Sequence, residues 1–291
     1  MKDLDEETKK IILASQRNEV TEHFIYGRLS QSTKDPHNKE VLKRIAGEEL
    51  EHYNFWKEYT NKDVAADKLK IWKYSYISRI FGITFGIKLM ERGEEQAKIT
   101  YENISKFVPD AKSILKDEDE HEKELIELID EERLRYISSV VRGWNDALVS
   151  LLGALAGLTL VLQNSRIIAM AGLITGIAES LAISAAEYLS TKSEEGIQEP
   201  SKAAVYSGSA YLLTVLFLIF PYLLFTNFYF SLSFTILNAL IVISIFSFYI
   251  SVAKDISFRE RFFEMTLISL GIAALTFGIG FLVRTLLHVE M

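Results

Sequence analysis

The chain has 291 residues, a length typical of two domains, and it contains no cysteine. Disulfides, cysteine-ligated zinc and iron–sulfur clusters are therefore excluded. The formal net charge is −7, which argues against a nucleic-acid partner.

The charged residues are concentrated in the first half of the chain. Residues 1–137 carry 24 of the 32 Lys and Arg and 29 of the 39 Asp and Glu, whereas residues 138–291 are strongly apolar. The N-terminus is acidic and lacks an apolar core, so it does not resemble a signal peptide. We therefore expect an all-α protein with a charged cytoplasmic domain at residues 1–137 and a membrane domain at residues 138–291.

Helical periodicity predicts four helices in the charged domain, over residues 4–33, 36–59, 70–107 and from Pro109 onward. The second helix has a clear start, because Asp35 is a good N-cap residue and Pro36 is favoured at the first helical position. Every one of these helices carries acidic residues or histidine. The residues of interest are Glu19 on the first helix, Glu49 and His52 on the second, Glu91 and Glu94 on the third, and Glu118 and His121 on the fourth.

Two of these helices carry a Glu-x-x-His pair. Glu49 and His52 are three residues apart, as are Glu118 and His121, so each pair shares one helix face. A single pair of this kind is more often part of a solvated helix face. Two pairs, together with carboxylates from two other helices, form the ligand set of a di-iron or di-manganese helix bundle. The sequence therefore predicts a metal centre inside the bundle.

The order of these motifs along successive helices resembles the rubrerythrin branch of the ferritin-like superfamily, over roughly residues 10–135. Glu19 followed by Tyr26 resembles the first helix of that family, and the run Glu118–Lys123 resembles its last helix. The resemblance implies a four-helix ferritin-like bundle that holds two iron ions, or manganese. Carried over residue by residue, the ligands are Glu19, Glu49, His52, Glu91, Glu94, Glu118 and His121. In a different register of the third helix, Glu95 would replace Glu91 or Glu94.

The first half of the third helix, Ile71–Met90, is unusually aromatic, and Gly82 and Gly86 form a small-x-x-x-small step that allows close helix approach. Three basic residues in this segment argue against a membrane span. We expect it to form buried packing or a homodimer surface.

Five apolar runs in the second half are each long enough to cross about 30 Å of hydrocarbon at 1.5 Å per residue. They lie at about residues 139–163, 166–190, 203–226, 229–253 and 263–287. Most of the basic residues around them fall before the first run or in two loops on the same side of the membrane. The positive-inside rule therefore predicts an N-terminus in the cytoplasm and a C-terminus outside.

Three carboxylates lie inside the first two runs: Asp146 in the first, and Glu179 and Glu187 in the second. Charges within membrane spans are costly and usually mark a substrate or ion path. Many small residues surround them, which permits close packing around a narrow polar route. The alternative is that Asp146 and Glu187 lie at the membrane interface and are simply hydrated.

The segments Gly143–Val149 and Glu187–Ser190 resemble the first two spans of the vacuolar iron transporter family, whose members are dimeric Fe(II)/H⁺ exchangers. This resemblance extends over about residues 136–291. Ile183 stands where the family has a methionine, and the long cytoplasmic insert of plant members is reduced to Thr191–Lys202. A ferritin-like domain ahead of the spans could take over metal capture, and the whole chain resembles the membrane-bound ferritin-like iron exporters of prokaryotes.

Together the two resemblances imply a homodimeric transporter in a lipid bilayer, the prokaryotic plasma membrane. It would export Fe(II), or Mn(II), from the cytoplasm in exchange for protons, and the di-iron bundle would capture or sense the metal. The alternative is a membrane-tethered di-iron ferroxidase or peroxidase whose spans are only an anchor. Rubrerythrins feed electrons through a cysteine-ligated iron domain that this chain lacks, although oxygen or peroxide could still oxidise bound Fe(II). Five spans with internal carboxylates favour the transporter.

Overall fold

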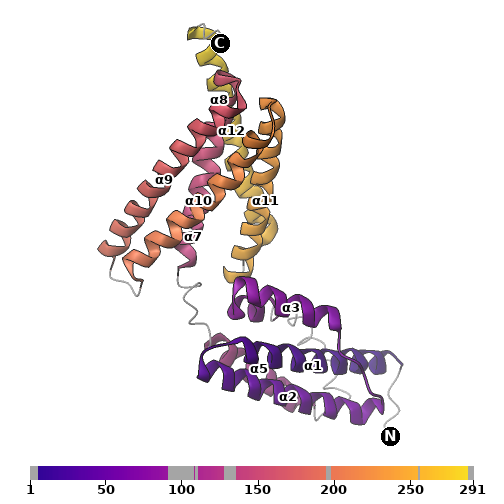
Figure 1. Ribbon diagram of the computed structural model, residues 1–291. Coiled ribbons are helices and arrows are strands. Elements are labelled where there is room, and N and C mark those ends of the chain that lie inside the picture. Colours follow the sequence, from indigo (N-terminus) through magenta and orange to yellow (C-terminus); the bar gives the residue numbers. More distant parts are fainter. Residues whose placement is uncertain are drawn as a thin grey trace. The chain divides into compact units, whose positions relative to one another are not determined.

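A computed structural model describes residues 6–90, 108, 111–127, 136–194, 198–254 and 256–287. The chain divides into two compact units, Met1–Glu131 and Glu132–Met291. Helices make up the regular structure of both units, and no strand occurs within the described ranges (Figure 1). The prediction of an all-α protein is therefore confirmed.

The N-terminal unit is built on two long helices, α1 (Glu6–Ser32) and α2 (Pro36–Thr60), which lie side by side (Figure 1). The predicted start of α2 is confirmed: the Asp35 side chain accepts a hydrogen bond of 2.9 Å from the Asn38 N–H, and Pro36 is the first helical residue. Helices α3 (Lys68–Phe81) and α5 (Ala111–Glu127) complete the described part of this unit.

Two groups of buried side chains hold the N-terminal unit together. The larger one joins α1 and α2 through residues such as Ile25, Leu29 and Ile45, and the smaller one surrounds the fully buried Trp56. The removal of these apolar side chains from water is the main force that holds the helices in register. Because the buried faces of α1 and α2 also carry Glu19, Glu49 and His52, the same packing brings these polar groups into the interior.

The prediction of a single helix over residues 70–107 is wrong at Gly82, where the helix is interrupted. Helix α3 ends at Phe81, and the chain resumes a helical course at residue 83 after Gly82. Gly82 has φ 104° and ψ 155°, a conformation that only glycine adopts without strain. Gly86 packs against Ser78 of the same chain, and a Cβ at Gly86 would clash with the Ser78 hydroxyl. The two glycines therefore have separate roles within this chain: Gly82 interrupts the helix, and Gly86 allows close packing against Ser78.

The C-terminal unit contains five helical spans within the described residues, each long and apolar enough to cross a membrane. The first is continuous through α7 (Ile137–Asp146), η1 (Ala147–Leu151) and α8 (Leu152–Leu162). The others are α9 (Ser165–Ser193), α10 (Pro200–Leu224), α11 (Phe228–Lys254) and α12 (Phe258–Leu287). The predicted five spans are confirmed, and the protein is an integral membrane protein.

Gly143 sets the position of the first span. A Cβ on Gly143 would clash with the backbone carbonyl oxygen of Ser207 on α10, so only glycine lets α7 and α10 approach this closely. This close contact holds α7 against α10 within one turn of Asp146. Asp146 is the last residue of α7, and the next turn, η1, is π-helical. Such single π-helical turns inside α-helices occur frequently at functional sites.

Candidate metal centre and membrane carboxylates

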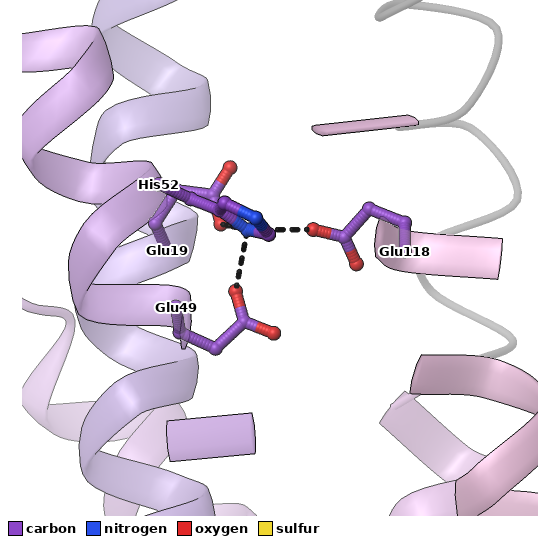
Figure 2. A group of neighbouring side chains, drawn as sticks. All are labelled: Glu19, Glu49, His52 and Glu118. Carbon is purple, nitrogen blue, oxygen red and sulfur yellow. Dashed lines mark ion pairs between the residues drawn. The ribbon is translucent and has the colours of Figure 1, made fainter. Parts of the chain in front are cut away.

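Four side chains of the N-terminal unit converge on one point in the bundle (Figure 2). Glu19 comes from α1, Glu49 and His52 come from α2, and Glu118 comes from α5. Each offers one ligand atom, and these atoms all lie within 4.8 Å of one another. Glu19, Glu49 and His52 are buried, and the Glu118 side chain is largely covered.

The first histidine faces three carboxylates through one ring nitrogen. His52 Nδ1 lies 3.3 Å from Glu118 Oε1, 3.6 Å from Glu49 Oε2 and 3.7 Å from Glu19 Oε2. These are the ion pairs drawn in Figure 2. A neutral histidine nitrogen surrounded by carboxylate oxygens is a ligand set that suits Fe, Mn and Zn.

His121 approaches the same carboxylates from the other end. Its Nδ1 lies 3.2 Å from Glu49 Oε1 and 4.0 Å from Glu118 Oε2, and its ring centroid is 5.8 Å from that of His52. Glu49 and Glu118 therefore each direct one oxygen toward His52 and the other toward His121. These two carboxylates could therefore help to hold a metal ion beside either histidine.

The outer nitrogen of each histidine meets a carboxylate that the sequence analysis missed. His52 Nε2 lies 3.4 Å from Asp117 Oδ2, and His121 Nε2 lies 2.7 Å from Glu48 Oε2. A carboxylate at Nε2 holds the proton there and leaves Nδ1 free to bind a metal. The signal was present in the sequence, because an acidic residue precedes each Glu-x-x-His pair. The partners cross over: each of these acidic residues contacts the histidine of the other helix.

Two further residues, Trp56 and Arg44, help to orient the cluster. The Trp56 indole Nε1 donates a 3.0 Å hydrogen bond to Glu19 Oε1, which leaves Oε2 as the oxygen nearest His52. Arg44 pairs with Glu48 at 2.9 Å and also contacts Glu124. Partial burial raises the pKa of Glu48, but the hydrogen bonds from Arg44 and His121 outweigh that effect and lower the pKa overall, which favours the ionised carboxylate as the acceptor for His121.

The electrostatics of the cluster favour a bound cation. Burial raises the pKa of Glu49 well above its usual range, and the neighbouring Glu118 carboxylate raises it further. Burial likewise raises the pKa of Glu118. Burial lowers the pKa of His52, but its carboxylate neighbours outweigh that effect and raise it overall. Metal binding at these carboxylates therefore competes with proton binding.

The donor atoms fit a metal by a second criterion. Three buried atoms of the cluster, Glu49 Oε2, His52 Nδ1 and His121 Nδ1, have no hydrogen-bond partner among the described residues. Leaving buried polar atoms unsatisfied is costly, and such atoms in a native protein need an explanation. Divalent metal ions between the two histidines would satisfy all three. The predicted ligands Glu91 and Glu94, and the alternative Glu95, lie outside the described residues.

In the membrane unit, the structure brings Asp146 and Glu179 to one cavity of about 290 Å³. Its other lining residues are Val149, Ser150, Ala182 and Ile183. Glu179 accepts a 2.9 Å hydrogen bond from the Ser150 hydroxyl and a second hydrogen bond from the Tyr211 hydroxyl on α10. The sequence analysis missed Ser150 and Tyr211, because a hydroxyl in an apolar helix carries no distinctive pattern.

Glu187 has a different environment. It is buried, and its Oε2 lies 2.6 Å from Arg142 Nη1 on α7. It does not line the cavity that contains Asp146 and Glu179. The first two spans are thus linked by the ion pair between Glu187 and Arg142, and both spans line the cavity that contains Glu179.

Residues 137–201 match the model of the VIT family. This stretch contains Asp146, Glu179 and Glu187, together with Arg142 and Ser150. No curated protein matches the chain. The family match confirms the predicted resemblance of the first two spans to the vacuolar iron transporters. With the five spans, it supports a membrane protein that transports metal ions.

Proposed function

We propose that this protein exports Fe(II), or Mn(II), from the cytoplasm in exchange for protons. The observation that carries the proposal is the cavity that joins Asp146 and Glu179, inside the region that matches the VIT family. Carboxylates bind hard and borderline divalent cations when ionised and release them when protonated. Two carboxylates at one cavity between spans can therefore exchange a metal ion for protons.

The hydroxyls around Glu179 support this role. Ser150 and Tyr211 donate to the Glu179 carboxylate, so its charge is partly compensated without a fixed cation beside it. A permanent ion pair would compete with the metal, and among these carboxylates it is Glu187 that has one, with Arg142. We therefore assign substrate binding to Asp146 and Glu179. We assign to Glu187 the task of holding the two spans together on the side where the N-terminus lies.

The N-terminal unit, in this proposal, is a ferritin-like bundle with a dinuclear metal site. Glu19, Glu49, His52 and Glu118 would hold metal at one end of the cluster, and His121 would bind it at the other. Glu91 and Glu94, which lie outside the described residues, are the remaining proposed ligands. A centre of this kind binds iron or manganese and supplies the bundle with a means of capturing or sensing the transported metal. The unit faces the cytoplasm, and the protein works as a homodimer.

The test is metal flux into proteoliposomes that contain the purified full chain. Asp146→Asn and Glu179→Gln keep the side-chain size and remove the titration, so each should abolish most Fe(II) transport. Glu264→Gln is the matched control, because Glu264 lies in the membrane unit and pairs with Arg261 away from the cavity. Metal binding by the bundle should stay intact in all three variants. Transport at the parent rate in both cavity variants would reject the proposal and favour a tethered ferroxidase.

A further inference from the structure

Helix α3 exposes a stripe of large apolar side chains that the N-terminal unit does not bury. Leu69 is 80% exposed, Trp72 is 62% exposed and Tyr76 is 52% exposed. At 100° per residue, these three positions fall on one face of the helix. The Trp72 and Tyr76 rings stack on each other, with centroids 5.3 Å apart and planes within 8°. The stripe is therefore a continuous surface.

The opposite face of α3 is the one that packs into the unit. Ile71 and Ser78 are buried there, and Ile71 belongs to the core that joins α1 and α2. The helix thus has one apolar face in the protein core and a second apolar face outside it. Exposed apolar side chains that lie next to one another in this way usually mark an interaction site.

The charges beside the stripe have one sign. On the helical wheel Lys73 flanks one side of the stripe, and Lys68 and Arg79 flank the other. Helix α3 contains no acidic residue, although the chain as a whole has a net charge of −7. Aromatic and apolar residues between basic ones are typical of a helix that lies in the headgroup region of an anionic bilayer.

We propose that this face of α3 docks onto the anionic lipid surface of the membrane that holds the protein's own spans. Trp72, Tyr76 and Leu69 enter the headgroup region, and Lys68, Lys73 and Arg79 contact lipid phosphates. The N-terminal unit ends at Glu131 and the first span begins at Ile137, so the chain between them reaches about 20 Å at most. A surface tethered this closely to a bilayer needs only a weak intrinsic affinity to be occupied.

A second copy of the chain is the competing occupant, and charge argues against it. In a twofold symmetric dimer the same patch packs against itself, so the basic residues Lys68, Lys73 and Arg79 of one copy would lie near those of the other copy. Like charges at an interface oppose association, whereas phosphate headgroups complement them. The docking does not depend on metal transport, so it stands or falls separately from the proposed function.

The test uses the natural absence of cysteine, which leaves no background for site-directed labelling. A Tyr76→Cys variant of the full chain carries a nitroxide spin label, and the protein is placed in nanodiscs. The discs contain either phosphatidylcholine alone or phosphatidylcholine with phosphatidylglycerol. Glu40→Cys, at an exposed position on α2, is the matched control. Collisions of the label with oxygen report contact with lipid, and collisions with a water-soluble nickel chelate report contact with water.

With phosphatidylglycerol present, the label at position 76 should gain oxygen collisions and lose nickel collisions severalfold, while the label at position 40 should not change. Lys73→Glu with Arg79→Glu should remove this lipid dependence, and Lys43→Glu, an exposed charge reversal on α2, should preserve it. Nickel access at position 76 equal to that at position 40 in anionic discs would overturn the proposal. Spin–spin broadening that disappears on dilution with unlabelled chain would also overturn it, and would assign the face to a second copy.

Discussion

Glu48 offers a sharp test of the proposed metal centre, because it contacts the cluster through His121. Replacing Glu48 by Gln removes the charge that accepts from His121 Nε2 at 2.7 Å and keeps the side-chain size. Losing such an outer partner typically lowers metal affinity by about 10- to 100-fold, which is about 1.4 to 2.7 kcal/mol. The Glu48 side chain is 34% exposed, so water can replace part of the contact. We therefore expect metal affinity to fall by about tenfold, near the lower end of this range.

Asp117→Asn should have a smaller effect on the His52 end. The Asp117 contact is longer, at 3.4 Å, and its side chain is 48% exposed, so less is lost when the charge is removed. Glu51→Gln, an exposed carboxylate on the same helix as Glu48, is the matched control and should leave affinity unchanged.

Anaerobic titration of the purified full chain with Fe(II), or with Mn(II), measures the affinity for each of the two proposed metal ions. Glu48→Gln should weaken one of the two steps, and Asp117→Asn should weaken the other. If Glu48→Gln binds both ions as tightly as the Glu51→Gln control, the histidines do not bind metal through Nδ1 as we infer.

Three further predictions concern the two sites. Changing His52 and His121 together to Ala should abolish most of the binding of about two metal ions per chain, which metal analysis of the purified protein can measure. Metal affinity should rise with pH and binding should release protons, because the raised pKa values of Glu49 and His52 mean that a metal must displace protons there. Calorimetry in buffers of different ionisation enthalpy detects that release, and an equal heat in all buffers would contradict it. Tyr211→Phe removes a hydrogen-bond donor to Glu179 and should slow transport roughly tenfold, which corresponds to a loss of about 1.5 kcal/mol. Metal binding by the bundle should not change. An unchanged transport rate would exclude Tyr211 from the transport site.

The parts of the fold that were predictable from the sequence follow from local patterns. The five spans are runs of apolar residues whose length alone indicates a membrane crossing. The start of α2 needs only Asp35 and Pro36, which act within one turn of the helix. The Glu-x-x-His spacing likewise fixes a shared helix face before any tertiary contact is known.

The details that the sequence did not reveal depend on packing between distant segments. Gly82 interrupts a helix whose periodicity continues through it, and a glycine inside a helical pattern does not by itself indicate a break. Glu48 and Asp117 each serve the histidine of the other helix, a crossing that depends on how α2 and α5 face each other. The pairing of Glu187 with Arg142 similarly depends on the register between α7 and α9.

In our proposal, the membrane unit exchanges a divalent metal for protons. Proteoliposomes that contain the full chain and a pH-sensitive dye test it directly when Fe(II) is added outside under anaerobic conditions. Fe(II) entry should be accompanied by proton exit, an imposed proton gradient should drive Fe(II) movement, and both signals should be lost together in Glu179→Gln. Fe(II) movement without any change in internal pH, or no movement at all in the parent protein, would contradict it.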